Sequence, residues 1–579
     1  MMFLAKLFLF LRVCLGGEII SLTHCLDKVC RTWFKSPPRP FAAHAIGIIE
    51  DSWNEKNLFL IEAPTGYGKS TISASIALYT LQEELKSIIA FPLRTLLEDQ
   101  FRKFSQLFDA NTLGKRYMHN PGSPYLIKPV TLTTVDTLSL TMFGIPPEEL
   151  DRVLRNSSWT STSSVGHYMF SWSSVALANL VLDEVHLLSD CTKSINFLLT
   201  LIRSALDNDQ KVILMSATLP ESFVNAIMDF ASDDLSVHIR FHDGLDSDFV
   251  ADRREKQYEI NVSALGEDRF EVIKGWIRER DHSRVLVVFN TIADAVEFYR
   301  RIRNDFNGYS KLLLHSRFNG RDREAKAEML EKIKNREKYI IVSTQIVEAG
   351  VDISSDLFIT EACPANSLVQ RFGRFLRYEG EFEGDAYVWY RVDDSQELRA
   401  KNGKYGVYDA ELVSRTVGRL KGIRNLHLPE NYEKILEVYG PEDFVYSKRE
   451  IDGLFEVFMN FERGGEKAVE KFIELEGSFV RESLLVPVVD GELLNSCTTD
   501  GRVNLEMLTK LCVPVDIRVL KYKPLKAVFT ERGGEMKSES SVVRDYRIVD
   551  ERRYLRDSVN IAAVVVEAEY DSELGLLMG

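Results

Sequence analysis

A loop framed by two glycines carries the side chains that a nucleoside triphosphate requires. It follows an apolar run at residues 58–63 and opens a helical pattern. Glycines at positions 66 and 68 let the backbone curl, so that successive N–H groups face an anion, and the N-terminus of the following helix adds positive charge. Lys69 is expected to reach the β- and γ-phosphates, and Ser70 to hold Mg²⁺. The residues expected to bind ATP are Thr65, Gly66, Tyr67, Gly68, Lys69, Ser70 and Thr71.

An acidic pair ends another apolar run, in the segment LVLDEVH at residues 180–186. At the carboxyl end of a buried strand, Asp183 would hold Mg²⁺ through its shell, and Glu184 would accept the proton of the attacking water. On its own such a pair is typical of a solvated loop, and the phosphate loop makes catalysis the favoured interpretation. We expect His186 to be a coupling residue, because no second histidine stands at metal-ligand spacing.

Three arginines, with no acidic residue among them, lie within residues 370–377. Planar guanidinium groups can spread the charge of a γ-phosphate, so Arg374 and Arg377 are predicted to be arginine fingers, with Gln370 as a further catalytic residue. Because the two arginines are three positions apart, they can share one helix face. The alternative is a solvated or salt-bridged basic surface. If these arginines and Lys69 contact one ATP, the nucleotide lies between two domains.

Short apolar runs, each followed by a longer helical pattern, recur up to about residue 428. Strands buried on both faces form continuous apolar runs, so the pattern predicts an α/β fold with two parallel sheets. The runs predicted as strands are residues 58–63, 87–91, 130–134, 180–182, 212–215, 285–289, 312–314, 340–343, 357–360 and 386–390. Beyond this point, Val-rich runs at 484–489, 513–519 and 559–566 indicate a smaller α+β domain.

The predicted domains are an apolar N-terminal extension (1–36), an ATP-binding domain (37–235), a second domain with the arginine fingers (236–427), and a linker with a C-terminal accessory domain (428–579). A polar, weakly periodic stretch near residues 230–258 indicates the boundary between the sheets. The apolar N-terminal run is far too short to span a membrane, and a helix packed on the first domain is expected there. The Ser- and Thr-rich segment 156–174 is expected to form an exposed loop.

Composition limits the class of protein. The chain has 579 residues with 72 Lys and Arg against 86 Asp and Glu, a net charge of −14, and 45% hydrophobic residues. These values are ordinary for a globular chain and exclude a largely disordered or fibrous one. Seven scattered cysteines form no readable disulfide or metal framework, which indicates a reduced, cytoplasmic protein. Net acidity does not exclude nucleic acid, because binding depends on local patches such as residues 300–338, with twelve basic and six acidic residues.

Together with Ser216-Ala217-Thr218, these motifs resemble superfamily 2 helicases of the DExH kind, over about residues 37–425. The finer matches are similar to the CRISPR-associated helicase of type I interference. The segments that carry this resemblance are FPLRTLLEDQ (91–100), TLTTVDTL (131–138), LVLDEVHLL (180–188), LLHSRF (313–318), STQIVEAGVDIS (343–354), EACPANSLVQRFGRFLR (361–377), YGVYDAELVSRT (405–416) and AEYDSELGLL (568–577).

The resemblance implies two tandem RecA-like domains that use ATP to move 3′ to 5′ along single-stranded DNA, at the R-loop that a Cascade complex forms with its guide RNA. It assigns the coupling of ATP to strand grip to His186, Ser216, Thr218, Gly350 and Asp352. Loop residues at strand ends can hold successive phosphates without reading bases. The residues that the resemblance assigns to nucleic acid are Arg94, Thr95, Thr133, Thr134, His315, Arg317, Thr344 and Gln345.

Two features depart from the family pattern. Ala42 stands where the adenine-reading motif carries glutamine, which puts adenine selection through that amide in doubt. The usual family member also begins with a metal-dependent HD nuclease domain. Fewer than 40 residues precede the helicase core here, and the His-Asp dipeptide at 242–243 falls between the predicted domains. A split form is therefore predicted, in which a separate HD nuclease subunit cuts the DNA.

The leading hypothesis is thus an ATP hydrolase and DNA helicase of type I CRISPR interference, without a membrane partner. Two alternatives remain at this point. One is a superfamily 2 RNA helicase or remodelling factor on the same core. The other is an ATP-gated nucleic-acid clamp that holds its partners without unwinding.

Overall fold

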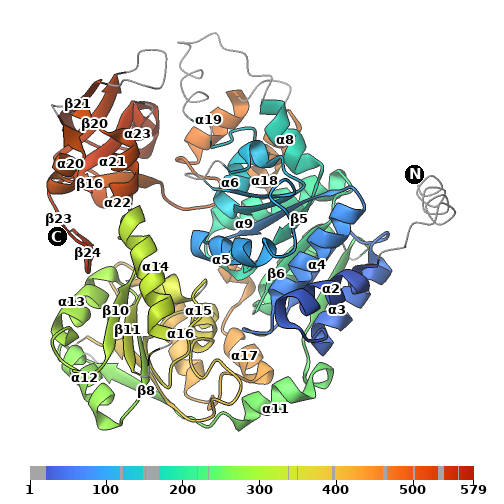
Figure 1. Ribbon diagram of the computed structural model, residues 1–579, viewed down its shortest axis with the longest axis horizontal. Helices are drawn as coiled ribbons and strands as arrows, with labels where there is room; N and C mark the ends of the chain where they lie inside the picture. The colour runs from blue at the N-terminus through green and yellow to red at the C-terminus, as the bar shows by residue number, and fades with distance from the viewer. Residues whose placement is uncertain are drawn as a thin grey trace.

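The computed structural model describes residues 21–578 except 118–121, 148–149, 151–167, 218, 233, 335, 337, 349, 394–397, 461–465, 500–501, 532–539 and 559. In this part of the chain two parallel sheets and a smaller mixed sheet form three bodies (Figure 1). We call the bodies around the two parallel sheets the first lobe and the second lobe. The body around the mixed sheet is the accessory domain.

The sheet of the first lobe has the strand order β3-β4-β2-β5-β6-β1-β7, and every pair in it is parallel. Its strands are β1 (Leu58–Glu62), β2 (Lys86–Phe91), β3 (Leu113–Arg116), β4 (Val130–Thr134), β5 (Ala178–Leu182), β6 (Val212–Ser216) and β7 (Ser236–Arg240). Leu60 packs in one core with Phe197, whereas its neighbour Phe59 packs in another core with Phe41. Both faces of the sheet are therefore buried, which explains the unbroken apolar runs.

Helices cover both faces of this sheet. They are α2 (Leu22–Phe34), α3 (Pro40–Ser52), α4 (Lys69–Gln82), α5 (Arg94–Phe104), α6 (Val135–Met142), α8 (Tyr168–Ala176), α9 (Thr192–Asp207) and α10 (Glu221–Ala231), with short 3₁₀ turns η1 (Pro124–Leu126) and η2 (Val185–Leu188). Helices α2 and α3 pack against α4. Part of the predicted N-terminal extension is thus a packed helix, and its residues 1–20 lie outside the described residues.

The second lobe repeats the arrangement with the strand order β10-β11-β9-β12-β13-β8, again with parallel pairs. Its strands are β8 (Ile260–Leu265), β9 (Arg284–Val288), β10 (Ser310–Leu314), β11 (Tyr339–Ser343), β12 (Leu357–Glu361) and β13 (Asp385–Arg391). Its helices are α12 (Arg269–Glu279), α13 (Ile292–Ile302), α14 (Gly320–Lys334) and α15 (Ala365–Phe372), with η4 (Gln345–Val347). Between the lobes run η3 (Asp243–Leu245) and α11 (Ser247–Glu255).

The rest of the chain returns across both lobes. Its helices are α16 (Ala410–Leu420), α17 (Pro429–Leu436), α18 (Lys448–Met459), α19 (Glu466–Glu474), α20 (Gly491–Ser496), α21 (Leu505–Leu511), α22 (Ile517–Leu520) and α23 (Glu551–Ser558), with η5 (Pro441–Asp443). Its strands are β14 (Lys404–Tyr405), β15 (Tyr408–Asp409), β16 (Leu485–Asp490), β17 (Thr498–Thr499), β18 (Arg502–Val503), β19 (Val513–Asp516), β20 (Leu525–Glu531), β21 (Ser540–Tyr546), β22 (Ile561–Val566), β23 (Glu569–Asp571) and β24 (Gly575–Leu577). The mixed sheet has the order β19-β16-β22-β20-β21.

The accessory domain is tied to each lobe at a separate place. Helix α18 packs on α9 of the first lobe, and Arg481 forms a two-pronged salt bridge with Asp136. The β23–β24 hairpin contacts the second lobe, where the Leu576 N–H donates to the carbonyl of Arg317. The chain therefore passes from the first lobe to the second, returns to the first lobe at α18, and contacts the second lobe again at the hairpin.

The predicted fold class is confirmed, and each of the ten predicted runs forms a strand of the two parallel sheets. Strands β3, β7 and β8 were not anticipated, because these edge strands mix polar with apolar residues and so form no continuous apolar run. Since β7 pairs with β1, residues 236–240 belong to the first sheet, beyond the predicted boundary at 235. Two predictions need correction. The run 513–519 turns into α22 after residue 516, and α8 occupies the end of the supposed loop 156–174.

Within the described residues, the helices that the structure shows are all too short or too polar to cross a bilayer.

Candidate active site

The phosphate loop joins the end of β1 to the start of α4. Gly66 and Gly68 have φ angles of +77° and +97°, which glycine adopts without strain. Gly68 is the N-cap of α4, and the helix begins at Lys69. The N–H groups at the start of the helix therefore lie at the loop, together with a lysine that is only 8% exposed. This geometry is a cradle for phosphate.

The acidic pair lies beside this cradle at the end of β5. Glu184 has a left-handed backbone with φ of +52°, a strained conformation of the kind found at functional sites. Its Oε1 is 3.4 Å from Lys69 Nζ. Although burial alone would raise the pKa of Glu184, the Lys69 ammonium group lowers it. Burial, together with the charge of Glu184, raises the pKa of Asp183 to about 7.

These charges fit a divalent cation. Asp183 and Glu184 together exceed the single positive charge of Lys69, and Glu184 Oε2 is buried without a hydrogen-bond partner among the described residues. Ser70 and Asp183 are the side chains that would hold Mg²⁺, which neutralises phosphate charge when bound. Glu184 Oε2 is then the oxygen that remains available to accept a proton.

His186 connects the acidic pair to the next strand. Its Nδ1 is 3.0 Å from the Oγ of Ser216 at the end of β6. Burial lowers the pKa of His186 to about 4, so the imidazole is neutral at physiological pH. Its Nε2 is also buried with no hydrogen-bond partner in the described part of the chain. The geometry fits a link between the catalytic carboxylate and β6, whereas Thr218 lies outside the described residues.

The segment with the predicted fingers is not helical, which corrects the expectation that Arg374 and Arg377 share a helix face. Helix α15, which holds buried Gln370, ends at Phe372. The chain then turns back, and Phe375 pairs with Ser355 across a β-bridge. We call residues 373–377 the finger segment. Its two arginines diverge: Arg377 pairs with Asp352, and Arg374 donates to the carbonyls of residues 347 and 348.

The finger segment nevertheless touches the phosphate loop of the other lobe. A Cβ on Gly373 would lie only 3.0 Å from Thr65 Oγ1, so glycine permits this approach. Burial lowers the pKa of Arg374 to about 9, and the nearby Arg377 adds to the effect, while Glu184 opposes it. Arg374 is thus a poorly compensated guanidinium group within electrostatic reach of Glu184. The two lobes meet where a γ-phosphate would lie.

A second contact between the lobes involves Gly350, whose φ angle is +76°. A Cβ there would lie 2.7 Å from Thr95 Oγ1 and 2.9 Å from the N of Leu96. Only glycine therefore allows this loop to pass α5 of the first lobe. The loop also carries Asp352, so it lies between the finger segment and α5, as its predicted coupling role requires.

Arg371, the remaining arginine of the motif, is fully buried in the second lobe. Its Nε is 2.8 Å from Glu348 Oε1. Its other nitrogens donate to Thr360, Asn290, Tyr408 and the carbonyl of Glu361. All three nitrogens of the guanidinium group are thus hydrogen-bonded within the second lobe. Arg371 therefore holds the strand ends together and is not available to bind a ligand.

Several residues predicted to contact nucleic acid are buried instead, which corrects those assignments. His315 is 2% exposed, stacks on Phe318, and contacts the carbonyl of Leu574 in the C-terminal hairpin. The hydroxyl of Thr133 donates to the carbonyl of Arg116 inside the sheet. Both side chains are already hydrogen-bonded to backbone carbonyls within the protein. Only the backbone of these residues could contact a nucleic acid.

Three further residues predicted to contact nucleic acid are buried or hydrogen-bonded within the protein. Thr134 caps α6 through its hydroxyl, and Thr344 is 4% exposed. The side-chain amide of Gln345 donates to the carbonyl of Asn290. Arg94, Thr95 and Arg317 are the predicted contacts that stay partly exposed.

A basic group between the lobes includes one residue that the motifs did not indicate. Burial lowers the pKa of both Arg317 and Arg323, and Arg94 lowers that of Arg323 further. Among the described residues neither Arg317 nor Arg323 forms an ion pair. Arg94 comes from α5, and Arg323 from α14 of the opposite lobe. The excess of basic residues at 300–338 was the only sequence signal for Arg323.

Two family models match the chain. A DEAD/DEAH box helicase model covers residues 39–227, which hold the phosphate loop and the acidic pair. A model described as CRISPR-associated nuclease/helicase Cas3, C-terminal, covers residues 281–380, which hold the finger segment. The first lobe thus matches a DEAD/DEAH box helicase model, and the second lobe matches the C-terminal model of the Cas3 helicases.

Curated proteins and solved structures agree with these matches. The chain is 26% identical over 435 residues to the CRISPR-associated nuclease/helicase Cas3 of Methanothermobacter thermautotrophicus, covering 70% of this chain and 47% of that protein. It is 28% identical over 373 residues to the CRISPR-associated helicase Cas3 of Thermoproteus tenax, covering 61% and 59%. Its fold matches that of T. fusca Cas3-ADP with a TM-score of 0.60 at 17% identity, over 84% of this chain and 65% of that one. It also matches a chain in "CRISPR RNA-guided surveillance complex, pre-nicking", with a TM-score of 0.59 at 16% identity, over 93% and 70%.

The resemblance to the CRISPR-associated Cas3 helicases is thereby confirmed, and the two lobes are tandem RecA-like domains. The chain spans about half the length of the curated relatives it matches.

We predict that Arg371→Met destabilises the second lobe by about 3–5 kcal/mol, because it leaves Glu348 buried without its partner. Urea unfolding followed by hydrogen exchange in β9, β11 and β12 measures this change. The control is Arg280→Met, since Arg280 is 71% exposed and its salt bridge with Asp385 contributes below about 1 kcal/mol. Equal losses for the two variants would contradict the structural role of Arg371.

Proposed function

We propose that this chain is an ATP-dependent translocase and helicase on single-stranded DNA, of the DExH kind, that acts in type I CRISPR interference. The observation that carries the proposal is the seam between the lobes. There the finger segment touches the phosphate loop, and Arg374 lies within electrostatic reach of Glu184. A nucleotide in this seam would contact both lobes, so its hydrolysis would change how the lobes are held together.

Each side chain has a distinct task in this reaction. The N–H groups of residues 65–71 and the Lys69 ammonium group hold the triphosphate, and Ser70 and Asp183 hold Mg²⁺. Glu184 Oε2 takes the proton of the attacking water. The guanidinium groups of Arg374 and Arg377 stabilise charge on the γ-phosphate. Gln370, near the end of α15, is a further catalytic residue in this proposal. His186, Ser216, Thr218, Gly350 and Asp352 transmit the change to the strand.

The strand is proposed to lie across both lobes on the basic group formed by Arg94, Arg317 and Arg323. Partly buried guanidinium groups that form no ion pair with the described carboxylates favour an anion, and phosphate is the anion that a nucleic-acid backbone offers. Arg94 and Arg323 belong to different lobes, so relative motion of the lobes would change their spacing along a bound strand. Contacts of this kind hold the backbone without reading the sequence.

The proposed partners are a Cascade complex with its guide RNA and a separate HD nuclease subunit, in the cytoplasm. The Cascade partner is supported by the fold match to a chain of a CRISPR RNA-guided surveillance complex. The separate nuclease is supported by the name of the Thermoproteus tenax relative, CRISPR-associated helicase Cas3, which does not mention a nuclease, and by the scattered histidines of this chain. The alternatives are an RNA helicase and an ATP-gated clamp.

We predict that single-stranded DNA stimulates ATP hydrolysis and that two variants separate binding from chemistry. Lys69→Ala abolishes ATP binding because it removes the cation that faces the phosphates. Glu184→Gln keeps ATP bound but stops turnover, because the amide cannot accept a proton. The measurements are binding of a fluorescent ATP analogue and phosphate release with DNA, RNA or neither. Stimulation by RNA alone favours the RNA helicase, and turnover without strand displacement favours the clamp.

The split-subunit proposal predicts that the purified chain does not cut DNA with Mg²⁺, Mn²⁺, Ni²⁺ or Co²⁺. The physical reason is that the described residues offer no group of three or more ligands for a nuclease metal. The measurement is nicking of single-stranded plasmid-length DNA by wild type and by Glu184→Gln. Metal-dependent nicking that persists in Glu184→Gln would show that this chain carries a nuclease of its own.

We further predict that Arg323→Gln weakens binding of single-stranded DNA and lowers the salt dependence of log Kd by about 0.7, the value for one phosphate contact. Fluorescence anisotropy with a labelled oligonucleotide at several salt concentrations measures both quantities. Arg321→Gln is the matched control, because Arg321 is on the same helix but 65% exposed and paired with Asp322. If both variants change the slope equally, the basic group between the lobes does not bind the strand.

A further inference from the structure

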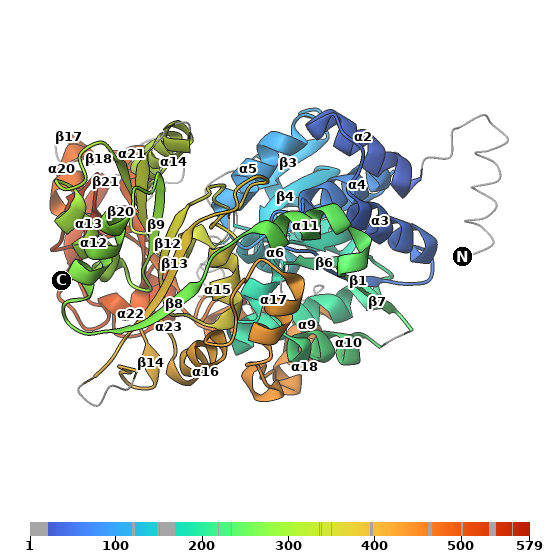
Figure 2. The same cartoon turned by 90° about the horizontal axis from the view of Figure 1, so that it is seen from below.

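Helix α11 runs between the lobes and is anchored to the loops that handle the nucleotide on both sides. Figure 2 shows β8 and α11 as a green path from one lobe to the other. The helix has nine residues and is therefore about 13 Å long. None of the predicted motifs includes it. Its contacts nevertheless concentrate on the phosphate loop and on the chain that follows the finger segment.

Arg253 forms the first anchor. Its Nη2 donates to the carbonyl of Thr65 at 2.6 Å, which is part of the phosphate loop. Its Nη1 donates to the carbonyl of His427 and to the hydroxyl of Tyr432, which follow the second lobe. The side chain is 6% exposed and stacks on Phe249. A planar guanidinium group can make these bonds at once, whereas a lysine ammonium cannot reach all three.

A second bond fixes the start of the helix, whereas Arg253 lies in its last turn. The Tyr67 hydroxyl donates to Asp246, the N-cap of α11, at 2.7 Å, and accepts from the N–H of Phe41. Thr65 and Tyr67 are two positions apart on the phosphate loop, so the loop is held at two points by residues of one helix. A displacement of the loop by a nucleotide therefore acts directly on α11.

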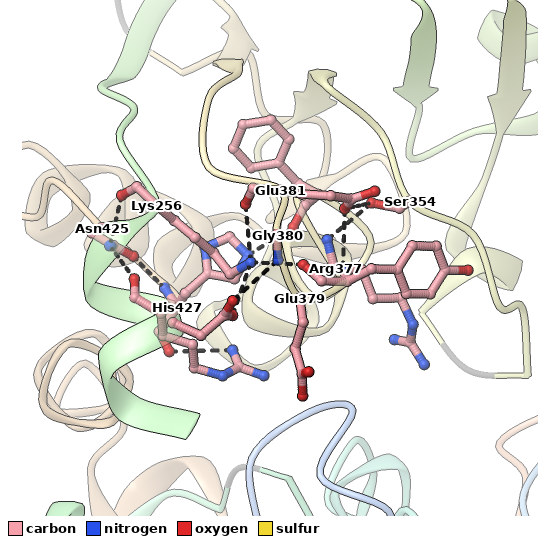
Figure 3. Close-up of polar contacts among 12 residues, drawn as sticks. Lys256, Ser354, Arg377, Glu379, Gly380, Glu381, Asn425 and His427 are labelled. Atoms are coloured by element: carbon pink, nitrogen blue, oxygen red, sulfur yellow. Dashed lines mark hydrogen bonds and ion pairs between the residues drawn. The ribbon is translucent and has the colours of Figure 1, made fainter. Parts of the chain in front are cut away.

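The C-terminal end of the helix, next to Arg253, also holds the turn at residues 378–381, directly after the finger segment. The Lys256 ammonium group donates to the carbonyls of Tyr378 and Glu381 at 3.0 and 3.1 Å (Figure 3). It also pairs with Asp252, which accepts from the N–H of Gly380. Lys256 is only 3% exposed, and each end of the turn is bound to it.

The finger segment is also held from its own side. In Figure 3 the turn 378–381 lies between Lys256 and Ser354. The hydroxyl of Ser354 donates to Glu381 and accepts from the N–H of Arg377. Buried His427, whose carbonyl accepts from Arg253, donates through Nε2 to the carbonyl of Phe375. Bonds therefore connect Thr65 on one side to Phe375 and Arg377 on the other.

We propose that α11 is a strut that sets the position of the arginine fingers relative to the phosphate loop, with Arg253 and Lys256 as its positioning residues. This inference rests on the proposed ATPase. Neither residue has to touch the nucleotide for this role. Their bonds keep the finger segment aligned with the γ-phosphate as the lobes close, and they carry a displacement of the phosphate loop to the fingers.

The test uses Lys256→Met, which keeps the side-chain stem but removes the three polar contacts, and Arg253→Lys. We expect roughly a 10²-fold loss of DNA-stimulated kcat, the effect of a misplacement of about 1 Å, with unchanged KM for ATP in Lys256→Met. In the Arg374→Ala background, Lys256→Met should cause no further loss, because it acts through the finger. Arg254→Lys is the control, since Arg254 is 59% exposed and bonds only Asp243.

A second readout does not depend on turnover. Hydrogen exchange at residues 374–381 should slow when AMP-PNP and Mg²⁺ bind to the wild type, and this protection should be lost in Arg253→Lys and Lys256→Met. Wild-type kcat in both variants, losses that multiply with Arg374→Ala, or unchanged protection would each overturn the strut. Absence of nucleic-acid-stimulated ATPase in the wild type would instead contradict the proposed function, and the exchange experiment would still decide the strut.

Discussion

Close approach of the two lobes at two glycines is the constraint on which the rest of this structure depends. A Cβ on Gly350 would lie only 2.7 Å from Thr95 Oγ1 of the opposite lobe, and a Cβ on Gly373 would be in tight contact with Thr65 at 3.0 Å. With glycine at both positions the seam closes, and closure buries Lys69, Asp183 and Arg374 together. Charges in such a seam are far less screened than on the surface, so Lys69 lowers the pKa of Glu184, and Glu184 opposes the fall in the pKa of Arg374. The electrostatics of the site therefore follow from a steric requirement.

Local patterns in the sequence predicted what local forces determine. Continuous apolar runs identified the inner strands, and the spacing of Gly66, Gly68 and Lys69 located the phosphate loop, because one strand, one turn and one helix suffice to build it. Edge strands such as β7 escaped, since polar residues interrupt their apolar runs. The burial of His315 was equally hidden, because its partner Leu574 lies at the far end of the chain. Arg253 and Lys256 gave no signal, since most of their acceptors are backbone carbonyls, which every residue has.

The C-terminal part of the chain limits what the lobes can do. It leaves the second lobe, packs α18 on the first, and returns to the second through the β23–β24 hairpin. Gly575, with φ of +78°, lies so close to His315 and Arg317 that a Cβ would clash with both. The loop with Arg317 is therefore shaped by the accessory domain, although its sequence motif belongs to the second lobe. Motion of the lobes and the contact with the β23–β24 hairpin therefore both affect the loop that carries Arg317.

The arginines of the finger motif show why residue type alone does not identify a catalytic group. Arg371 is surrounded by Glu348, Tyr408 and Cys363, and although burial opposes the charged form, these groups raise its pKa. Arg374, three residues later and equally buried, bonds only backbone carbonyls, and its pKa falls to about 9. The first guanidinium group gains nothing from another anion, whereas the second would be stabilised by one. Because Arg374 lies at the contact between the two lobes, a triphosphate bound in the phosphate loop of the opposite lobe would supply that anion.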